Sequence, residues 1–300
     1  IGFDLALAGL DPLQGSLLVS LDADTLVDST YLPAIEKHFA GSDKGGAVLP
    51  FLHRCDGSCE SRSAIETYEL YLRAYPLGLH LAGSPYAYPT LGSAMACTAE
   101  AYVRAGGMNR RPAGEDFYFL QQLAKTGGVA QLYGTVVRPS ARLSARTPFG
   151  TGPSMLRLTG GEEGVVAFHD PRVFEILGRW LRLAGCTPEA EARELLPRAA
   201  SIHPELAAFL VAADFQSAWT RLRDNGRGAV NPERFHDWFD GLKTFRLVRH
   251  LSQQDFPPGE PTAMVAPLLR MAGLPEGETV SEQNRRLCAF WGADIAKRVV

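Results

Sequence analysis

The stretch SLLVSLDADTLVDSTYL, residues 16–32, decides how the first part of the chain is organised. Its apolar run at 17–19 predicts a short buried strand, which leads the chain to Asp22 and Asp24. Side chains two residues apart on an extended segment point to the same side, so both carboxylates would face one space. Because a packed core does not accommodate two carboxylates, we expect a positive group beside them. Alternatively, one Asp caps the following turn and the other is solvated.

Residues 1–155 alternate between short apolar runs and amphipathic segments. The runs typical of strands are 17–21, 46–52 and 129–137. The segments typical of helices are 3–10, 29–39, 63–75, 98–106 and 116–125. We expect Pro76 to end or kink the third of these helices, and Thr98 to cap the fourth. Strands that alternate with helices predict an α/β layered domain.

Residues 156–300 lack this alternation. Strand signals are sparse there, and five segments that begin near a proline have the apolar spacing of amphipathic helices. These segments are 171–183, 188–196, 204–223, 232–251 and 261–272. The sequence therefore predicts an α/β domain over residues 1–155, followed by a helical region over residues 156–300.

A second acidic pair, Glu115 and Asp116, opens one of the predicted helices after a loop that contains Gly114. An acid in the first turn of a helix is favoured by the helix dipole, so capping alone explains the pair. A carboxylate held at the mouth of a domain can also take a proton from a hydroxyl group. The dipole would keep the pKa of that carboxyl low and make it a weaker base, so both interpretations stay open.

Two further segments carry candidate binding residues. Gly92 and Ser93 lie in a predicted loop, where glycine lets the backbone approach a ligand closely. Arginines at 138, 142 and 146 are spaced by four in RPSARLSAR and could clamp a diphosphate as it leaves. A basic surface segment without a partner explains them equally well.

The chain offers few metal ligands other than carboxylates. Asp22 and Asp24 would supply two hard oxygen ligands, which suit Mg²⁺ or Mn²⁺. His53, Cys55 and Cys59 lie close in sequence, but structural zinc sites usually show a second ligand pair, and none follows. His169 could supply a third ligand beside the two aspartates, although a lone histidine is more often a packing residue. Five scattered cysteines fit reduced thiols better than a disulfide framework.

The composition is that of a globular protein. The chain has 300 residues, of which 46% are hydrophobic and 21% charged, and its net charge of −3 gives no electrostatic case for nucleic acid. No apolar run approaches the ~18 residues that cross a bilayer. We therefore expect a cytoplasmic protein without a transmembrane segment, which leaves room for peripheral contact with a membrane.

Three motifs follow one another in the chain: D-x-D at 22–24, G-S-x₈-Y-x₃-G-G at 92–107, and G-E-D-x₆-L-x₃-G at 114–127. In this order and spacing they resemble the GT-A fold glycosyltransferases of family 2, over about half of the chain. The resemblance implies a Rossmann-like mixed sheet flanked by helices. It also implies that Asp22 and Asp24 hold Mn²⁺ or Mg²⁺ and the diphosphate of a UDP- or GDP-sugar.

The same resemblance implies that Asp116 is the general base of an inverting transfer, and that Glu115 contacts the acceptor or orients Asp116. Arg142 and Arg146, with Gly92 and Ser93, would belong to the donor site. The acceptor would be a hydroxyl group of a glycan, a lipid or a small molecule.

Two departures refine this expectation. Family members usually carry a nucleotide-binding βαβ unit ahead of the D-x-D, and only 21 residues precede Asp22, so we expect this chain to lack that unit. The Q-x-x-R-W motif of processive synthases is absent from the sequence, which favours transfer of a single sugar. The rival interpretations are a nucleotidyltransferase and a degenerate, non-catalytic binding module.

Overall fold

The computed structural model describes residues 2–10, 15–55, 58–109, 111, 114–145, 148 and 150–293. These residues form two compact units. The first unit takes the described residues of Ile1–Ala74, Tyr88–Ala167 and Leu274–Val300, and the second those of Tyr75–Ala87 and Phe168–Gly273. Each unit is thus assembled from segments distant in sequence, whereas the sequence suggested one division between residues 155 and 156.

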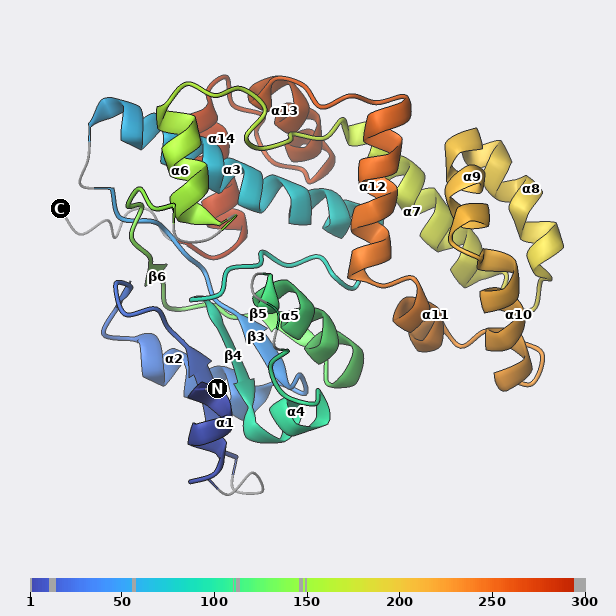
Figure 1. The fold of residues 1–300 in the computed structure, drawn as a ribbon, viewed down its shortest axis with the longest axis horizontal. Helices are drawn as coiled ribbons and strands as arrows, with labels where there is room; N and C mark the ends of the chain where they lie inside the picture. The colour runs from blue at the N-terminus through green and yellow to red at the C-terminus, as the bar shows by residue number, and fades with distance from the viewer. Residues whose placement is uncertain are drawn as a thin grey trace. The chain divides into compact units, whose positions relative to one another are not determined.

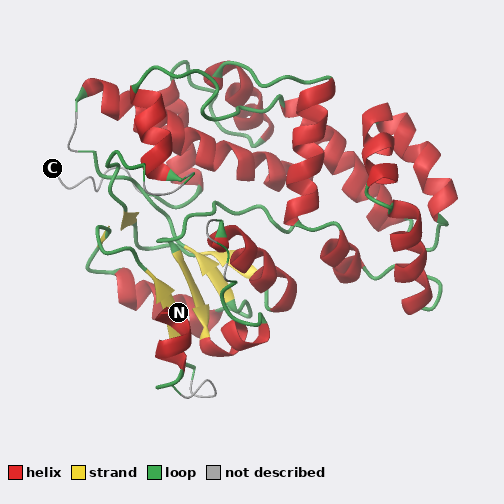
Figure 2. Cartoon of the chain, viewed as in Figure 1, coloured by secondary structure: helices red, strands yellow, loops and turns green. Residues whose placement is uncertain are grey.

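The first unit is built on a four-stranded mixed sheet in the order β1-β4-β3-β5 (Figure 1). Its strands are β1 (Leu17–Ser20), β3 (Gly46–Val48), β4 (Met95–Thr98) and β5 (Val129–Gln131). Strand β4 runs antiparallel to both of its neighbours, β1 and β3, and β3 pairs in parallel with β5. The α/β class predicted from the sequence is confirmed, with most of the regular structure helical (Figure 2).

Helices cover both faces of this sheet. The helices of the first unit are α1 (Gly2–Leu7), α2 (Tyr31–Gly41), α4 (Ala99–Arg104), α5 (Glu115–Thr126), α6 (Thr151–Thr159) and α14 (Val280–Phe290), with the first part of α3 (Cys59–Ala82). Residues that alternate along the strands enter different core clusters, as the two-residue period of a strand requires. Val48 packs with Phe119 and Leu123 of α5, whereas Ala47 packs with Ile35 of α2.

Two predicted elements differ from the observed ones for identifiable reasons. The single strand expected over 129–137 is two strands, β5 and β6 (Val137–Arg138), because Gly134 takes φ +93° and turns the chain between them. Strand β6 pairs instead with β2 (Leu26–Val27). Strand β4 was not predicted; it is four residues long, and its last residue, Thr98, is also the cap of α4. Thr98 does cap α4, accepting a hydrogen bond from the Ala101 amide at 3.1 Å.

Helix α3 continues through Pro76, so the end that the sequence allowed at this residue does not occur. A proline inside a helix costs about 3 kcal/mol because one hydrogen bond is lost and the ring meets the preceding turn. Leu77 and Leu79, on the far side of Pro76, are both buried. Burial of a leucine side chain returns ~1.5–3 kcal/mol, which is enough to offset the proline.

A buried polar network joins the C-terminal helix α14 to the first unit. The Glu69 carboxylate on α3 accepts hydrogen bonds from Arg73 Nη1 at 3.1 Å and Asn284 Nδ2 at 3.0 Å through Oε2. Its Oε1 accepts from the backbone amide of His53 at 2.6 Å and lies 3.0 Å from His53 Nδ1. Glu69 and Arg73 are only 2% and 1% exposed. Residues 274–293 therefore complete the sheet-containing unit, although the sequence placed them in a separate helical region.

The second unit contains the remaining helices. They are α7 (Pro171–Cys186), α8 (Ala192–Ile202), α9 (Pro204–Ala212), α10 (Phe215–Asn225), α11 (Pro232–Trp238), α12 (Gly241–Gln254) and α13 (Pro261–Met271), with the end of α3. Trp180 is fully buried, and its ring meets the rings of Phe215, Phe235 and Phe239 at centroid distances of 5.4, 6.0 and 6.2 Å. These rings form the aromatic core of the second unit.

Two of the long helices predicted for this unit are each divided. The segment 204–223 breaks at Asp214, which has φ 53° between α9 and α10. The segment 232–251 breaks before Asp240, whose side chain caps α12 by accepting from the Lys243 amide at 3.0 Å. Within the described residues no helix is both long and apolar enough to cross a membrane.

Replacing Glu69 should test the buried network. Burial alone would raise the pKa of Glu69, but Arg73 and His53 hold it well below its usual range. A depressed pKa means that the carboxylate stabilises the fold above about pH 4.3, and that this stability is lost as the pH falls towards the folded pKa. Glu69→Gln should lower the free energy of unfolding by about 3–5 kcal/mol at pH 7, because Arg73 stays buried without its counter-charge.

Urea denaturation followed by circular dichroism measures this loss, with Glu66→Gln on the same helix as the control. The difference from wild type should shrink as the pH is lowered below about 4. Equal effects of the two variants at pH 7 would show that the network does not hold the unit together.

Candidate functional site

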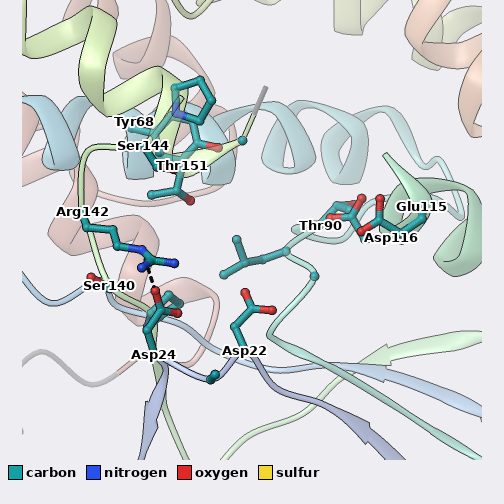
Figure 3. A pocket seen from close by; sticks show the side chains of 17 residues that line it. Asp22, Asp24, Tyr68, Thr90, Glu115, Asp116, Ser140, Arg142, Ser144 and Thr151 are labelled. Atoms are coloured by element: carbon teal, nitrogen blue, oxygen red, sulfur yellow. Dashed lines mark ion pairs between the residues drawn. The ribbon is translucent and has the colours of Figure 1, made fainter. Parts of the chain in front are cut away.

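A pocket of about 740 Å³ opens in the first unit (Figure 3). The chain reaches it from the end of β1, from α3, from the loop before β4, from the start of α5 and from residues 139–144 and 150–153. The polar side chains that line it are Asp22, Asp24, Tyr68, Thr90, Glu115, Asp116, Ser140, Arg142, Ser144 and Thr151. Segments far apart in sequence thus bring four carboxylates and one guanidinium group to a single cavity.

Asp22 and Asp24 follow β1 in a tight turn. The Thr25 amide donates to the Asp22 carbonyl at 3.0 Å and closes this turn. Arg54 Nη2 donates to the Asp24 carbonyl at 3.0 Å and fixes the turn from outside. Both carboxylates line the pocket (Figure 3), as the spacing of the two residues predicted. The carboxyl end of a strand in an open α/β sheet is where such proteins bind ligands.

The positive group expected beside these carboxylates is Arg142. Its Nε lies 2.8 Å from Asp24 Oδ2, and both side chains are partly exposed. Arg138 makes a second ion pair, with Asp28 at 3.1 Å, just after the same turn. A basic segment without partners therefore does not describe Arg138 and Arg142. Arg146, the third arginine of the series, lies outside the described residues.

Asp116 lies at the start of α5, after Gly114 in a left-handed conformation with φ 73°. Its Oδ1 accepts a hydrogen bond from the Phe117 amide at 2.7 Å. Burial raises the pKa of Asp116, and the negative charges of Glu115 and Asp22 raise it further, against the lowering effect of that hydrogen bond. This direction is opposite to the one expected from the helix dipole, because desolvation and like charges raise the pKa.

Of the predicted pair Gly92 and Ser93, only Gly92 reaches the pocket. A Cβ atom at Gly92 would lie 3.6 Å from Asp116 Oδ2, so the backbone passes directly beside this carboxylate. Ser93 is 2% exposed and is not among the described residues that line the pocket. The chain turns into the core here, because Ala94 and Ala96 on either side of Met95 belong to the sheet cluster.

A neutral wall faces the carboxylates, and sequence reasoning missed it. Tyr68 of α3 and Thr151 of α6 lie together on that wall, with Ser144 near them (Figure 3). Burial raises the pKa of Tyr68 to about 12, the hydrogen bond with Thr151 lowers it, and the charge of Asp116 raises it. In the sequence Tyr68 shares an apolar helix face with Ile65 and Leu72, a pattern that gives no signal that its hydroxyl group lines a pocket.

The neutral wall is connected to the buried network of the first unit. His53 Nε2 lies 3.3 Å from Thr151 Oγ1, while His53 Nδ1 contacts Glu69. His53 thus links the Glu69 network to the Thr151 side chain that lines the pocket.

Among the described residues considered as metal ligands, Asp22 and Asp24 are the two that fit a divalent cation. The described residues contain no cluster of three or more His, Cys, Asp or Glu side chains that could hold a metal. His53 is engaged by Glu69 and Thr151, which removes it from the suggested cluster with Cys55 and Cys59. His169 belongs to the second unit, where its Nδ1 lies 2.8 Å from Ser252 Oγ. Two carboxylates suit Mg²⁺ or Mn²⁺ when substrate phosphates complete the coordination.

Removing the Asp116 charge should stabilise the protein. A raised carboxyl pKa means that the protonated form is favoured in the fold, and that the ionised form destabilises it above the folded pKa. Asp116→Asn keeps an acceptor for the Phe117 amide and should raise Tm at pH 7 by a few degrees, since ~1 kcal/mol corresponds to about 2–4 °C in larger domains.

Thermal melts from pH 4 to pH 8 measure this effect, with the exposed Asp224→Asn as the control. The gain should disappear as the pH falls below about 4, where Asp116 is protonated in both the folded and the unfolded chain. A lower Tm at every pH would mean that the Asp116 charge supports the fold.

Comparisons with models of protein families, with curated proteins and with solved structures found no match to this chain. The family that the three motifs resemble is therefore a proposal for this protein. Its support comes from the residues that meet in the pocket.

Proposed function

We propose that this protein is a metal-dependent glycosyltransferase with a GT-A fold, which transfers one sugar from a nucleoside-diphosphate sugar to an acceptor hydroxyl with inversion. The observation that carries the proposal is the convergence of three separate motifs. Asp22 and Asp24, Gly92, and Glu115 and Asp116 all line one cavity. The mixed sheet with helices on both faces, and the acidic turn at the end of β1, also support this fold.

The donor half of the site would be the acidic turn and its arginine. Asp22 and Asp24 would hold Mn²⁺ or Mg²⁺, which when bound neutralises charge on the departing nucleoside diphosphate. Arg142 already lies 2.8 Å from Asp24, at the place where an anionic donor would meet the carboxylates. A guanidinium group suits bidentate binding of phosphate oxygens, so Arg142 would contact the diphosphate.

The acceptor half would centre on Asp116. A general base works best when its pKa lies near the working pH, and the raised pKa of Asp116 moves it in that direction. Glu115 contributes to this by its negative charge, which gives it an electrostatic role besides any contact with the acceptor. The hydrogen bond from the Phe117 amide to Oδ1 holds the carboxylate in place, with Gly92 beside Oδ2.

Asp24→Ala should weaken binding of UDP or GDP only when metal is present. Without metal the variant leaves Arg142 without its 2.8 Å partner, so binding should be unchanged or slightly stronger. Titration calorimetry in Mn²⁺, in Mg²⁺ and in EDTA measures the difference, with the exposed Asp224→Ala as the control. A variant that binds the nucleotide as well as wild type in Mn²⁺ would remove Asp24 from the metal site.

Asp116→Asn should abolish transfer while metal-dependent nucleotide binding stays nearly intact. Loss of a general base typically costs about 10²–10⁴-fold in rate, and an amide cannot accept the acceptor proton. Release of nucleoside diphosphate from a UDP- or GDP-sugar measures the rate, and calorimetry measures the binding. Equal loss of rate and of binding in a folded variant would rule out a dedicated base. Unchanged release of nucleoside diphosphate would show that another group is the base, and no release even by the wild type would favour a binding module.

A further inference from the structure

A second concave surface lies in the helical unit, between α7 and α8, which run side by side (Figure 1). This groove has a volume of about 490 Å³. It is lined by Arg179, Arg182, Leu183 and Cys186 of α7 and by Arg198, Ser201 and Ile202 of α8. None of the lining residues is acidic, so three guanidinium groups share one small region.

Within the part of the chain that the structure describes, the arginines of the groove are exposed and unpaired, unlike Arg172 and Arg193 of the same two helices. Among the described residues, the side chains of Arg179, Arg182 and Arg198 have no ion pair and no hydrogen bond. Arg193, only five residues before Arg198 on α8, contacts Glu191 at 2.6 Å, and Arg172 at the start of α7 contacts Asp170. Three exposed like charges on facing helices repel one another and attract an anionic partner.

The floor of the groove restricts the chemistry of that partner. Leu183 and Ile202 are partly buried at the floor, whereas the three arginines are exposed at the rim. An inorganic anion would leave these two side chains uncovered. A flat bilayer surface does not reach half-buried residues in a concave groove. An occupant that places apolar side chains inward and carboxylates at the rim satisfies both features.

We propose that the α7–α8 groove binds an acidic amphipathic peptide segment of a partner protein. Arg179 and Cys186 lie seven residues apart on α7, roughly 10 Å at the rise of an α-helix, which matches about two turns of a docked helix. Leucine-like side chains of the segment would cover Leu183 and Ile202. Its Asp and Glu side chains would pair with the three arginines, in the manner of helix-in-groove recognition. This proposal does not depend on the glycosyltransferase assignment.

The probe is a fluorescein-labelled amphipathic peptide of about 14 residues with Glu on one face and Leu on the other. One control peptide carries Lys in place of every Glu, and another carries Ser in place of every Leu. Fluorescence anisotropy measures binding to the full chain at low and high salt. The double variant Arg179→Glu with Arg198→Glu is compared with Arg221→Glu, an exposed arginine of α10 outside the groove. Thermal melts check that each variant is folded.

A second readout uses the exposed thiol of Cys186 as a reporter inside the groove. In a Cys59→Ser background, the acidic amphipathic peptide should slow maleimide labelling of Cys186, as located by mass spectrometry. This measurement localises the peptide even if the charge reversals disturb the fold.

We expect the Glu–Leu peptide alone to bind, with affinity falling with salt and falling roughly tenfold or more in the double variant but not in Arg221→Glu. Four results would overturn the proposal. They are no binding at low salt, equal binding by the double variant, no protection of Cys186, and binding of phosphatidylserine vesicles or inorganic phosphate at the groove in place of the peptide.

Discussion

The first unit depends on one buried ion pair, between Glu69 and Arg73, four residues apart on α3. Each group is nearly inaccessible to water and would be costly there alone. The free-energy cost of burying the two charges is offset because both oxygens of the Glu69 carboxylate have partners. These partners are His53, Arg73 and Asn284. These partners come from the segment after β3, from α3 and from α14, so one carboxylate ties together three parts of the chain.

The pocket stands under a second constraint, which is electrostatic. Four carboxylates line it, and among the described residues Arg142 offsets part of their charge through its ion pair with Asp24. Burial raises the pKa of Asp116, and the negative charges of Glu115 and Asp22 raise it further. Four like charges around one cavity do not stabilise the fold. The arrangement is therefore favourable for binding a ligand and unfavourable for stability. A cation bound by these carboxylates, together with a phosphate-bearing ligand, would compensate their negative charge. On the neutral wall opposite, His53 connects Thr151 to Glu69.

The sequence predicted those features that local patterns encode. An apolar run ending in Asp22 and Asp24 indicated a strand that opens on a site, and an acid in the first turn of a helix located Asp116. It could not predict that Tyr68 and Thr151 join them, because a tyrosine on the apolar face of a helix reads as core. The return of α14 to the first unit was equally invisible. It rests on the hydrogen bond between Asn284 and Glu69, which are 215 residues apart, and on packing of Cys288 against Leu52. Burial also outweighed two local sequence preferences. The α3 helix continues through Pro76, and the pKa of Asp116 is raised where the helix dipole alone predicts a lowered one.

The central claim is that the acidic turn and Asp116 act on one nucleoside-diphosphate sugar. The most direct measurement is ¹H and ³¹P NMR of UDP- and GDP-sugars incubated with the protein and Mg²⁺, in the presence of candidate hydroxyl acceptors or water alone. The account predicts metal-dependent release of the nucleoside diphosphate and a product with inverted configuration at the anomeric carbon. Cleavage within the diphosphate, to a nucleoside monophosphate and a sugar phosphate, would contradict it, as would retention of configuration.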